Sequence, residues 1–362
     1  ELMAVLKHVR FATMEEGFLR DTVRAWPALL STQGQGVLSK SLVPVVGGGQ
    51  PLPRLGFGPQ RIYLVGGFVS LVGLLSTVWA YDPALDTWCE VASMATKRCN
   101  HAATALGGKL YVIGGTTDDG ETTLDQVEVY DPKADSWQPL PSMPTARHFL
   151  AAVAVKGKVY TIGGTSTIED DEESCVDAVE AYDPISGAWT RLASLPVARC
   201  SHTATVVDGK IYVLGGLSVD PEYDYHGLSW TQCVDVYDPA ADSWQQMAAM
   251  PTARDSHAAA VLDGKIYVTG GIPSECADAL EVYDPAADTW TTLASMIQSR
   301  AYHASAVVKG KLWVFGGELP DGQDGSRSGR TNLVEVYSPA SNSWASAADV
   351  PVFTDQSTAV AL

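Results

Sequence analysis

The sequence predicts an all-β fold: a six-bladed β-propeller that is closed by the C-terminal strand and preceded by a short α-helical segment. Three observations predict it. A unit of roughly 50 residues recurs six times, each unit reads as short strands, and one connection per unit varies in length. Four short strands in each of six units, packed radially, give a propeller. A chain of 362 residues suits one such architecture, since all-β proteins often exceed the usual domain size.

The repeated unit is defined by a glycine pair, a tyrosine and a tryptophan. The tryptophan always stands seven residues after the tyrosine and 26 residues before the next glycine pair. The distance from glycine pair to tyrosine varies, from 13 residues at Gly270 to 22 at Gly215. Insertions confined to one connection predict loops on one face, often the binding face. The marker residues are Gly66, Gly114, Gly163, Gly215, Gly270 and Gly316, Tyr81, Tyr130, Tyr182, Tyr237, Tyr283 and Tyr337, and Trp88, Trp137, Trp189, Trp244, Trp290 and Trp344.

The strands within a unit are marked by turn residues. "HAAAVLDGKIYVTGG" reads as two β-rich runs joined by Asp-Gly, a hairpin turn, and "LEVYDPAADTW" reads as a second pair. The first unit begins at its second strand, "RIYLVGG", whereas "STAVAL" at 357–362 matches the first strand of the other units. We therefore expect the C-terminus to supply the inner strand of the first blade.

These units, with the "MPTAR" segments between them, resemble the Kelch-repeat family over residues 61–362. Residues 6–23, "LKHVRFATMEEGFLRDTV", are similar to the end of the BACK domain of Kelch-like proteins. A capping box at Thr13 and Glu16 and a stop at Pro27 predict a helix between them. We expect residues 1–42 to form a helical BACK-domain remnant and 43–60, rich in Gly and Pro, to be a linker.

The composition excludes several function classes. A net charge of −18 repels phosphate, so we expect neither nucleic-acid nor membrane binding. Residues 62–80 are uncharged and long enough for a membrane helix, but they align with two strands of the other units. The apolar residues between these strands are expected to form an exposed patch. This patch would either pack against the helical N-terminal segment or bind a partner. These residues include Phe68, Leu71, Leu74 and Leu75.

The six scattered cysteines indicate free thiols in a reducing compartment rather than disulfides or a zinc site. Four histidines share one repeat position, which favours a structural role: His101, His202, His257 and His303. No Ser-His-Asp group, phosphate loop or metal-spaced cluster stands out in the sequence. We expect no catalytic residue, metal or cofactor.

Arginine and acidic residues repeat together. An arginine stands ten residues after five of the tryptophans, but Thr354 holds the sixth position. An acid stands two residues before five of the tyrosines, but Trp79 holds the first position. Thr354 leads into the blade of Trp79, so we hypothesise a buried ion pair in each other blade; ligand binding by the arginines is the alternative. The pairs are Arg98 and Glu128, Arg147 and Glu180, Arg199 and Asp235, Arg254 and Glu281, and Arg300 and Glu335.

The repeated tyrosines and tryptophans are interpreted as packing between blades rather than as a ring that stacks on a ligand. The family resemblance implies partner contacts just after each arginine and just after each glycine pair. The first set is Asn100, His148, Phe149, Ser201, Asp255 and Tyr302, and the second is Phe68, Thr116, Thr165, Leu217, Ile272 and Glu318. The usual Ser after the arginine and Tyr after the glycine pair are largely missing, so no particular relative's ligand is implied.

Two variable loops add candidates. Residues 169–173 and Asp177 are acidic, which indicates either a solvated flap or a dock for a basic segment. The loop "VDPEYDYHGLSW" has the composition of interface anchors, with local packing as the alternative. Its aromatic residues are Tyr223, Tyr225, His226 and Trp230.

The resemblance implies a function in recognition: the substrate-binding part of a BTB–BACK–Kelch adaptor for cullin-type ubiquitin ligases. The expected partner is a protein or peptide substrate, and the expected location is the cytoplasm, with the nucleus left open. In that family the BTB domain engages the cullin, and it is not among these 362 residues, so this chain alone is not expected to dock a cullin. The alternatives are a non-ubiquitin scaffold, such as an actin-associated Kelch protein, and a propeller enzyme.

Overall fold

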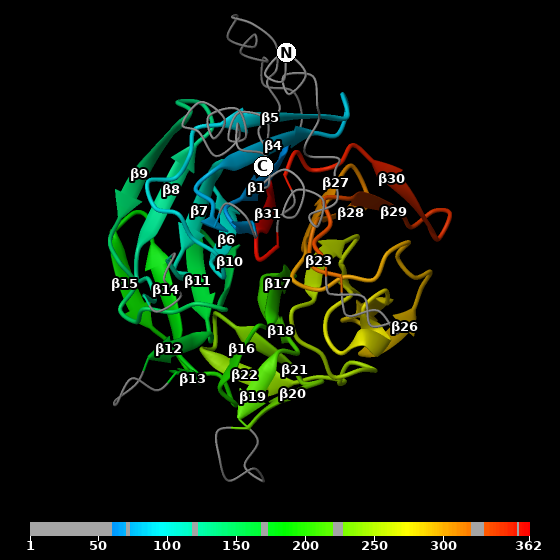
Figure 1. The fold of residues 1–362 in the computed structure, drawn as a ribbon. Coiled ribbons are helices and arrows are strands. Elements are labelled where there is room, and N and C mark those ends of the chain that lie inside the picture. Colours follow the sequence, from blue (N-terminus) through cyan, green and yellow to red (C-terminus); the bar gives the residue numbers. More distant parts are fainter. Residues whose placement is uncertain are drawn as a thin grey trace, which may run out of the picture.

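The computed structural model describes residues 60–69, 73–117, 122–167, 173–219, 227–319, 329–352 and 355–362. Within these ranges the chain forms six four-stranded antiparallel sheets that stand around a common axis (Figure 1). The predicted helical segment 1–42 and all but the last residue of the predicted linker 43–60 lie outside the described residues, so both stay predictions.

The sheets follow one another along the chain, each with its inner strand near the axis (Figure 1). The first three are β31 (Thr358–Ala361), β1 (Ile62–Val65), β4 (Val78–Asp82) and β5 (Thr87–Val91); β6 (Ala102–Leu106), β7 (Lys109–Ile113), β8 (Val127–Asp131) and β9 (Ser136–Leu140); and β10 (Ala151–Val155), β11 (Lys158–Ile162), β14 (Val179–Asp183) and β15 (Ala188–Arg191). The fourth to sixth are β17 (Thr203–Val207), β18 (Lys210–Leu214), β21 (Val234–Asp238) and β22 (Ser243–Gln246); β23 (Ala258–Leu262), β24 (Lys265–Thr269), β25 (Leu280–Asp284) and β26 (Thr289–Thr292); and β27 (Ala304–Val308), β28 (Lys311–Phe315), β29 (Val334–Ser338) and β30 (Ser343–Ala347).

The first sheet joins the two ends of the repeat region. Its inner strand β31 pairs with β1, from Ile62 opposite Ala361 to Val65 opposite Thr358. Trp88 of the same sheet donates its indole N–H to the carbonyl of Ala348, which follows the sixth sheet, at 3.0 Å. The first sheet therefore takes its inner strand from the C-terminus and contacts the sixth sheet directly.

The hydrophobic core is divided among the interfaces between neighbouring sheets. One cluster joins Tyr63 and Val65 of the first sheet to Leu110 and Val112 of the second, and equivalent clusters join the other neighbours around the axis. The middle strands are buried on both faces, which explains why "YVIGG" and its equivalents read as continuous apolar runs. Burying each large apolar side chain contributes about 1.5–3 kcal/mol.

The repeated tyrosine and tryptophan bind adjacent sheets together. In the second sheet Tyr130 donates its hydroxyl to Asp135 at 2.7 Å, and Trp137 donates its indole N–H to Ala92 of the first sheet at 2.7 Å. Asp135 also accepts the N–H of Ala92 at 2.9 Å. The indole bond to the preceding sheet recurs from all six tryptophans. Packing between sheets therefore accounts for their repetition.

The apolar stretch 62–80 contains strands and is not a single helix. β1 and β4 occupy its ends, and the short strands β2 (Phe68–Val69) and β3 (Gly73–Leu74) pair between them. In the part of the chain that the structure describes, no helix has the length and apolarity to span a bilayer. The expectation of an exposed patch is wrong for Leu74, which is the cross-strand partner of Phe68 in the β2–β3 hairpin and is only 4% exposed. Leu71 lies outside the described residues.

Other variable connections also form small sheets beyond the glycine pairs. In the third repeat β12 (Thr165–Thr167) pairs with β13 (Glu173–Cys175). In the fourth, β16 (Arg199–Cys200), β19 (Leu217–Val219) and β20 (Leu228–Trp230) form one sheet. The fifth carries the short 3₁₀ helix η4 (Ser274–Cys276). These additions lie at the same end of the strands as the glycine pairs.

Gly114→Ala tests the close approach at a glycine pair. Gly114 has φ +64°, and a Cβ there would lie 2.4 Å from the main-chain carbonyl oxygen of Arg147. We expect the free energy of unfolding, measured by urea denaturation, to fall by about 2 kcal/mol or more through backbone strain plus overlap. The control Gly157→Ala has φ +78° and no atom within 4 Å, so strain alone should cost about 1 kcal/mol. Equal losses would contradict the close approach.

Candidate recognition site

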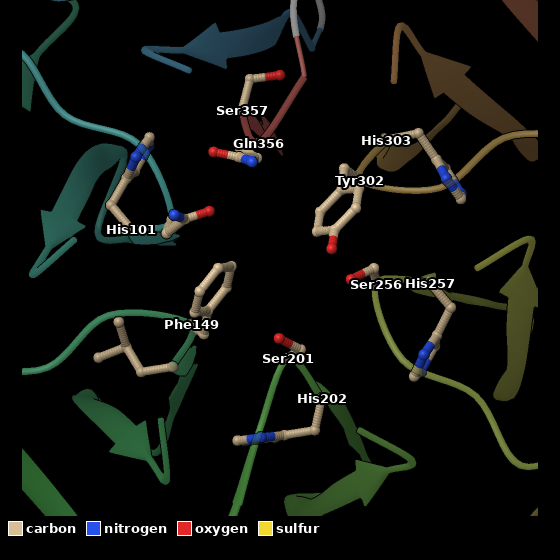
Figure 2. A pocket seen from close by; sticks show the side chains of 12 residues that line it. His101, Phe149, Ser201, His202, Ser256, His257, Tyr302, His303, Gln356 and Ser357 are labelled. Atoms are coloured by element: carbon tan, nitrogen blue, oxygen red, sulfur yellow. The ribbon is translucent and has the colours of Figure 1, made fainter. Parts of the chain in front are cut away.

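A hollow of about 140 Å³ lies on the axis where six loops, one leading into each sheet, converge (Figure 2). Each loop contributes the two residues just before the inner strand. Five of the first residues point toward the axis, while the histidines lie farther from it (Figure 2). The five are Phe149, Ser201, Ser256, Tyr302 and Gln356. The lining residues are Asn100, His101, Phe149, Leu150, Ser201, His202, Ser256, His257, Tyr302, His303, Gln356 and Ser357.

The residues closest to the axis share one unusual backbone conformation. Their φ angles lie between +51° and +55°, in the left-handed region that non-glycine residues rarely adopt. Five main-chain hydrogen bonds of 2.8–3.2 Å run from loop to loop, each N–H donating to the carbonyl of the preceding loop. These residues, called the rim below, are Asn100, Phe149, Ser201, Ser256, Tyr302 and Gln356. Such strain persists only where the surrounding structure imposes it, and it is frequent at binding sites.

The four repeated histidines form a buried layer beneath the rim. Burial, with the neighbouring arginine adding to it, lowers the pKa of His101, His202 and His303 to about 3 and that of His257 well below its usual range. They pack against the glycine pair of the preceding sheet: a Cβ at Gly163 would lie 2.7 Å from Cε1 of His202. The histidines are therefore neutral and fill space in the scaffold.

A second pocket, of about 390 Å³, adjoins the hollow on the side of the first and second sheets. It shares Asn100, Phe149 and Gln356 with the hollow. The Nε of Arg330 lies 2.9 Å from Oδ1 of Asp355, and its guanidinium carbon lies 4.8 Å from the centre of the Phe68 ring. A cation held between a carboxylate and an aromatic face is a stable arrangement. The other lining residues are Leu74, Cys99, Thr116, Thr117 and His148.

Carboxylates gather on one side of the rim. Burial raises the pKa of the Tyr302 hydroxyl, and the negative charges of Asp255, Glu318 and Asp355 raise it further. Burial also raises the pKa of Asp255, although Trp230 and Ser256 donate hydrogen bonds to it at 2.9 and 2.8 Å. These acids belong to the fifth, sixth and first repeats. The second to fourth repeats have no carboxylate at these two repeat positions: Cys99, His148 and Cys200 follow the arginine, and Thr116, Thr165 and Leu217 follow the glycine pair.

Two of the predicted first-set residues, His148 and Asp255, are backbone partners of predicted second-set residues, Thr165 and Ile272; the other second-set residues pair with residues that were not predicted. In each repeat the residue after the arginine position forms a bridge or strand pair with the residue after the glycine pair. The pairs are Cys99 and Thr116, His148 and Thr165, Cys200 and Leu217, Asp255 and Ile272, Ala301 and Glu318, and Asp355 and Phe68.

Exposure separates the described contact residues into three groups. Asn100, Phe149, Ser201 and Tyr302 line the hollow, and Trp230 is 47% exposed. Thr116, His148, Thr165 and Asp255 are buried, so their side chains support the rim and offer little surface. Phe68, Leu217, Ile272 and Glu318 are half-buried. Tyr223, Tyr225 and His226 lie outside the described residues, as do 169–172 of the acidic loop.

Seven residues that line the hollow or the second pocket were not predicted from the sequence: Cys99, Thr117, Leu150, Ser256, Arg330, Gln356 and Ser357. Ser256 and Gln356 occupy the same repeat position as Asn100, so a strict alignment of the six units would have found them. Ser357 stands where other repeats have the histidine. No sequence pattern pointed to Arg330 as a site residue, because it lies in a connection of variable length.

The five arginine–carboxylate pairs are present as buried contacts. Nitrogen–oxygen distances are 2.6 Å for Arg98 with Glu128 and for Arg147 with Glu180, and 2.7 Å for Arg254 with Glu281. Arg199 contacts Asp235 and Arg300 contacts Glu335 in the same way. In the first sheet the acid's position is held by buried Trp79, and Thr354 lies outside the described residues.

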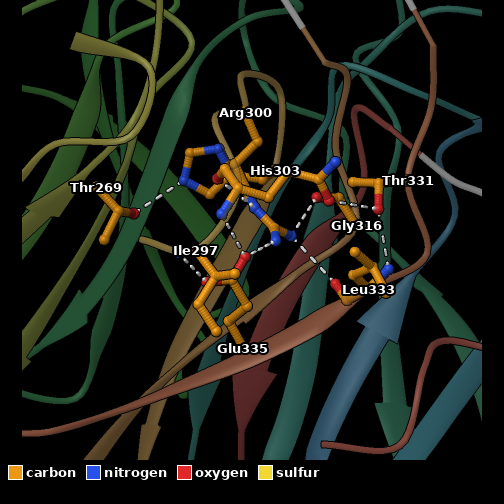
Figure 3. A network of polar contacts seen from close by, with 9 residues as sticks. Thr269, Ile297, Arg300, His303, Gly316, Thr331, Leu333 and Glu335 are labelled. Atoms are coloured by element: carbon orange, nitrogen blue, oxygen red, sulfur yellow. Dashed lines mark hydrogen bonds and ion pairs between the residues drawn. The ribbon is translucent and has the colours of Figure 1, made fainter. Parts of the chain in front are cut away.

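Each arginine also joins two sheets. Arg300 accepts a hydrogen bond on its carbonyl from Gly271 of the fifth sheet's glycine pair at 3.0 Å. Its guanidinium donates to the carbonyls of Gly316 and Leu333 of the sixth repeat at 2.9 and 3.1 Å and contacts Glu335 (Figure 3). The rim residue Tyr302 stands two residues later, so this joint positions it.

Comparison with known proteins identifies similar repeats and a similar fold. The chain matches the KLHDC2/KLHL20/DRC7 Kelch-repeats domain over residues 42–216 and 100–317, and the Kelch motif over 299–351. It is 45% identical to Kelch-like protein 24 of Rattus norvegicus over 194 residues, 54% of this chain and 29% of that protein. It is 28% identical to Kelch-like protein 15 of Danio rerio over 248 residues, 61% of this chain and 39% of that protein. The chain thus spans well under half the length of these relatives.

The solved structure of YjhT has a similar fold. It superposes with a TM-score of 0.64 at 15% sequence identity, covering 74% of this chain and 88% of that one. At this identity the likeness concerns the fold alone, and it agrees with the all-β repeat architecture.

Arg147→Met tests the buried ion pair. The change leaves the carboxylate of Glu180 buried without its guanidinium, so we expect unfolding free energy to fall by about 3–5 kcal/mol in urea denaturation. Lys158→Met in the same sheet is the control, because the 3.5 Å contact of Lys158 with Asp183 is exposed to solvent and should contribute about 1 kcal/mol or less. Similar losses in both variants would argue against a structural role for the arginine.

His202→Leu tests the neutral histidine layer through the pH dependence of stability. The pKa of His202 is about 3 in the folded chain and about 6.5 unfolded, so its contribution is complete above pH 6.5 and is lost as the pH falls toward 3. When the pH is lowered from 7.5 to 5, we expect the free energy of unfolding to fall less in the variant than in the wild type. The difference between the two falls should be at most about 1.4 kcal/mol per pH unit. Leu150 holds this position in the third repeat, so leucine suits the site. If the urea midpoint shifts equally with pH in the variant and in the wild type, the result would contradict a neutral His202.

Proposed function

Because this chain belongs to the Kelch-repeat family, we propose that it captures protein or peptide partners at the rim of its axial hollow. The observation that carries the proposal is the contrast between backbone and side chains. Six loops hold one strained conformation and are linked by hydrogen bonds, yet they present Asn, Phe, Ser, Ser, Tyr and Gln to the same space. A repeated backbone with differing side chains is suited to recognition of one specific surface.

The exposed aromatic Trp230 and the half-buried Phe149 and Tyr302 are the anchors in this proposal. Tryptophan and tyrosine are enriched among the residues that dominate binding energy at interfaces. The carboxylates of Asp255 and Glu318 beside Tyr302 favour partner segments that carry positive charge. The second pocket, beside Phe68 and Arg330, extends the surface toward the first and second repeats.

The finer proposal is that the chain is the substrate-recognition part of a BTB–BACK–Kelch adaptor for cullin-type ubiquitin ligases. Its mechanism is recognition rather than catalysis. A cullin would be engaged by a BTB domain outside these 362 residues, and residues 1–42 would be the end of a BACK domain. Cytoplasmic location, with the nucleus as the second compartment, belongs to the same proposal. The similarity to Kelch-like proteins 24 and 15 supports it.

We also propose that the six sheets are the six blades of a closed ring. The pairing of β1 with β31 and the bond from Trp88 to Ala348 support closure, because they join residues about 260 or more positions apart. Closure pairs the edge of β1 that would otherwise be left without a neighbouring strand.

Phe149→Ala and Tyr302→Ala together test the rim as the capture surface. We expect partner affinity, measured by titration of a captured partner, to fall at least tenfold, since anchors of this type commonly contribute more than 1.4 kcal/mol. Ile185→Ser is the control: Ile185 is 97% exposed and follows Asp183, at the other end of the strands from the glycine pairs. Unchanged affinity in the rim variant, or an equal fall in the control, would refute the proposed surface.

The adaptor role is tested separately in cells. Proteins captured by this chain should accumulate when the protein is depleted, and the rim variant should fail to restore their turnover. Capture without accumulation of any partner would argue against the ligase role while leaving recognition intact.

A further inference from the structure

Two thiols from different repeats meet beside the rim. The Sγ atoms of Cys175 and Cys200 lie 2.8 Å apart, although the residues are 25 positions apart in the sequence. Both cysteines are free, and they are 7% and 3% exposed. Cys175 also contacts the carbonyl of Leu217 of the fourth repeat at 3.7 Å.

The two cysteines lie on loop strands that belong to different blades. Cys175 ends β13, where it is the cross-strand partner of Thr165 in the variable connection of the third repeat. Cys200 ends β16, where it is the partner of Leu217 in the fourth repeat. Ser201, which follows Cys200 directly, lines the axial hollow. A link between the sulfurs would therefore tie a variable loop to the rim.

We propose that Cys175 and Cys200 form a reversible disulfide that locks the variable loop of the third repeat to the rim strand of the fourth. A disulfide has an S–S length of about 2.05 Å, so closing the 2.8 Å contact requires an approach of about 0.8 Å. The oxidant is a hydroperoxide, such as hydrogen peroxide, which is small enough for a site with low exposure.

The reaction proceeds in two steps. The Cys200 thiolate attacks one peroxide oxygen and breaks the O–O bond, which gives a sulfenic acid and, after protonation of the leaving hydroxide, one water. The Cys175 thiol then attacks the sulfenic sulfur, loses its proton and releases a second water as the S–S bond forms. Two thiols have lost two electrons and two protons to one peroxide. A dithiol reverses the reaction by exchange.

Local hydrogen bonds assign the two roles. Donation from the Cys175 thiol is the main cause that lowers the pKa of Cys200, and the hydroxyls of Thr165 and Ser201 lower it further. The same sulfur–sulfur contact, with burial, raises the pKa of Cys175. Cys200 is therefore the attacking thiolate and Cys175 the resolving thiol.

The disulfide does not depend on the proposed function, but its expected effect on partner binding does. The bond would hold Cys200, and with it Ser201, against the β12–β13 hairpin. Partner affinity should then depend on redox state through the third and fourth repeats, on the side of the rim that lacks the carboxylates around Tyr302.

The test is peroxide treatment of the reduced chain, followed by digestion without reductant and mass spectrometry. We expect a cross-linked peptide containing Cys175 and Cys200, a loss of two hydrogens from the intact mass, four rather than six titratable thiols, and recovery with dithiothreitol. Cys233→Ser is the control and should still give the cross-link. Cys175→Ser should leave a sulfenic acid on Cys200 that dimedone traps.

Absence of this cross-link in the wild type, or oxidation of Cys89 or Cys233 before the pair, would overturn the proposal. The mass readout needs no partner and no variant, so it stands apart from the recognition test. If the cross-link forms and affinity for a captured partner changes less than twofold, the locking consequence is refuted and the disulfide site remains.

Discussion

The rest of the structure depends on the contacts by which each repeated arginine joins two neighbouring sheets. Its carbonyl accepts from the glycine pair of one sheet, while its guanidinium contacts the carboxylate of the next sheet. In four of the five joints the guanidinium also donates to the first glycine carbonyl of that next sheet. A buried charge that loses its partner is strongly destabilising, so this contact sets the position of one blade against its neighbour. Glycine is needed because a Cβ would overlap the arginine carbonyl.

The joint also explains the rim. The residue two positions after each arginine is forced into the left-handed region, where its N–H and carbonyl link it to the neighbouring loops. The chain therefore holds bulky residues such as Phe149 and Tyr302 in a backbone conformation that is unfavourable for non-glycine residues. Buried histidines fill the layer below, and their neutrality avoids adding charge next to the arginines. The side chains above can differ without disturbing the scaffold.

The rim is chemically divided as a result. Carboxylates surround Tyr302 on the side of the fifth, sixth and first repeats, where Arg330 and Phe68 add a cation and an aromatic face. The side of the second to fourth repeats has no carboxylate at the equivalent positions, and there the thiols of Cys175 and Cys200 meet. One side of the rim therefore carries charged side chains. On the other side, the thiols of two loops lie close enough to form a disulfide. The contacts of Asp355 and Cys200 each join a repeat position to a residue of a variable connection, Arg330 and Cys175 respectively.

The sequence by itself determined the repeat, the strand pattern and the scaffold residues. The glycine pairs, tyrosines, tryptophans and arginine–acid positions recur at constant spacing, because every blade must meet the same neighbour in the same geometry. It also placed the C-terminal strand beside β1, since one inner strand was missing from the first unit. Only the tertiary structure decided which predicted contact residues face the hollow and which, such as His148 and Asp255, are buried beneath it. It alone brought Arg330 to Asp355 and Cys175 to Cys200, because connections of variable length carry no repeat register and their partners come from other blades.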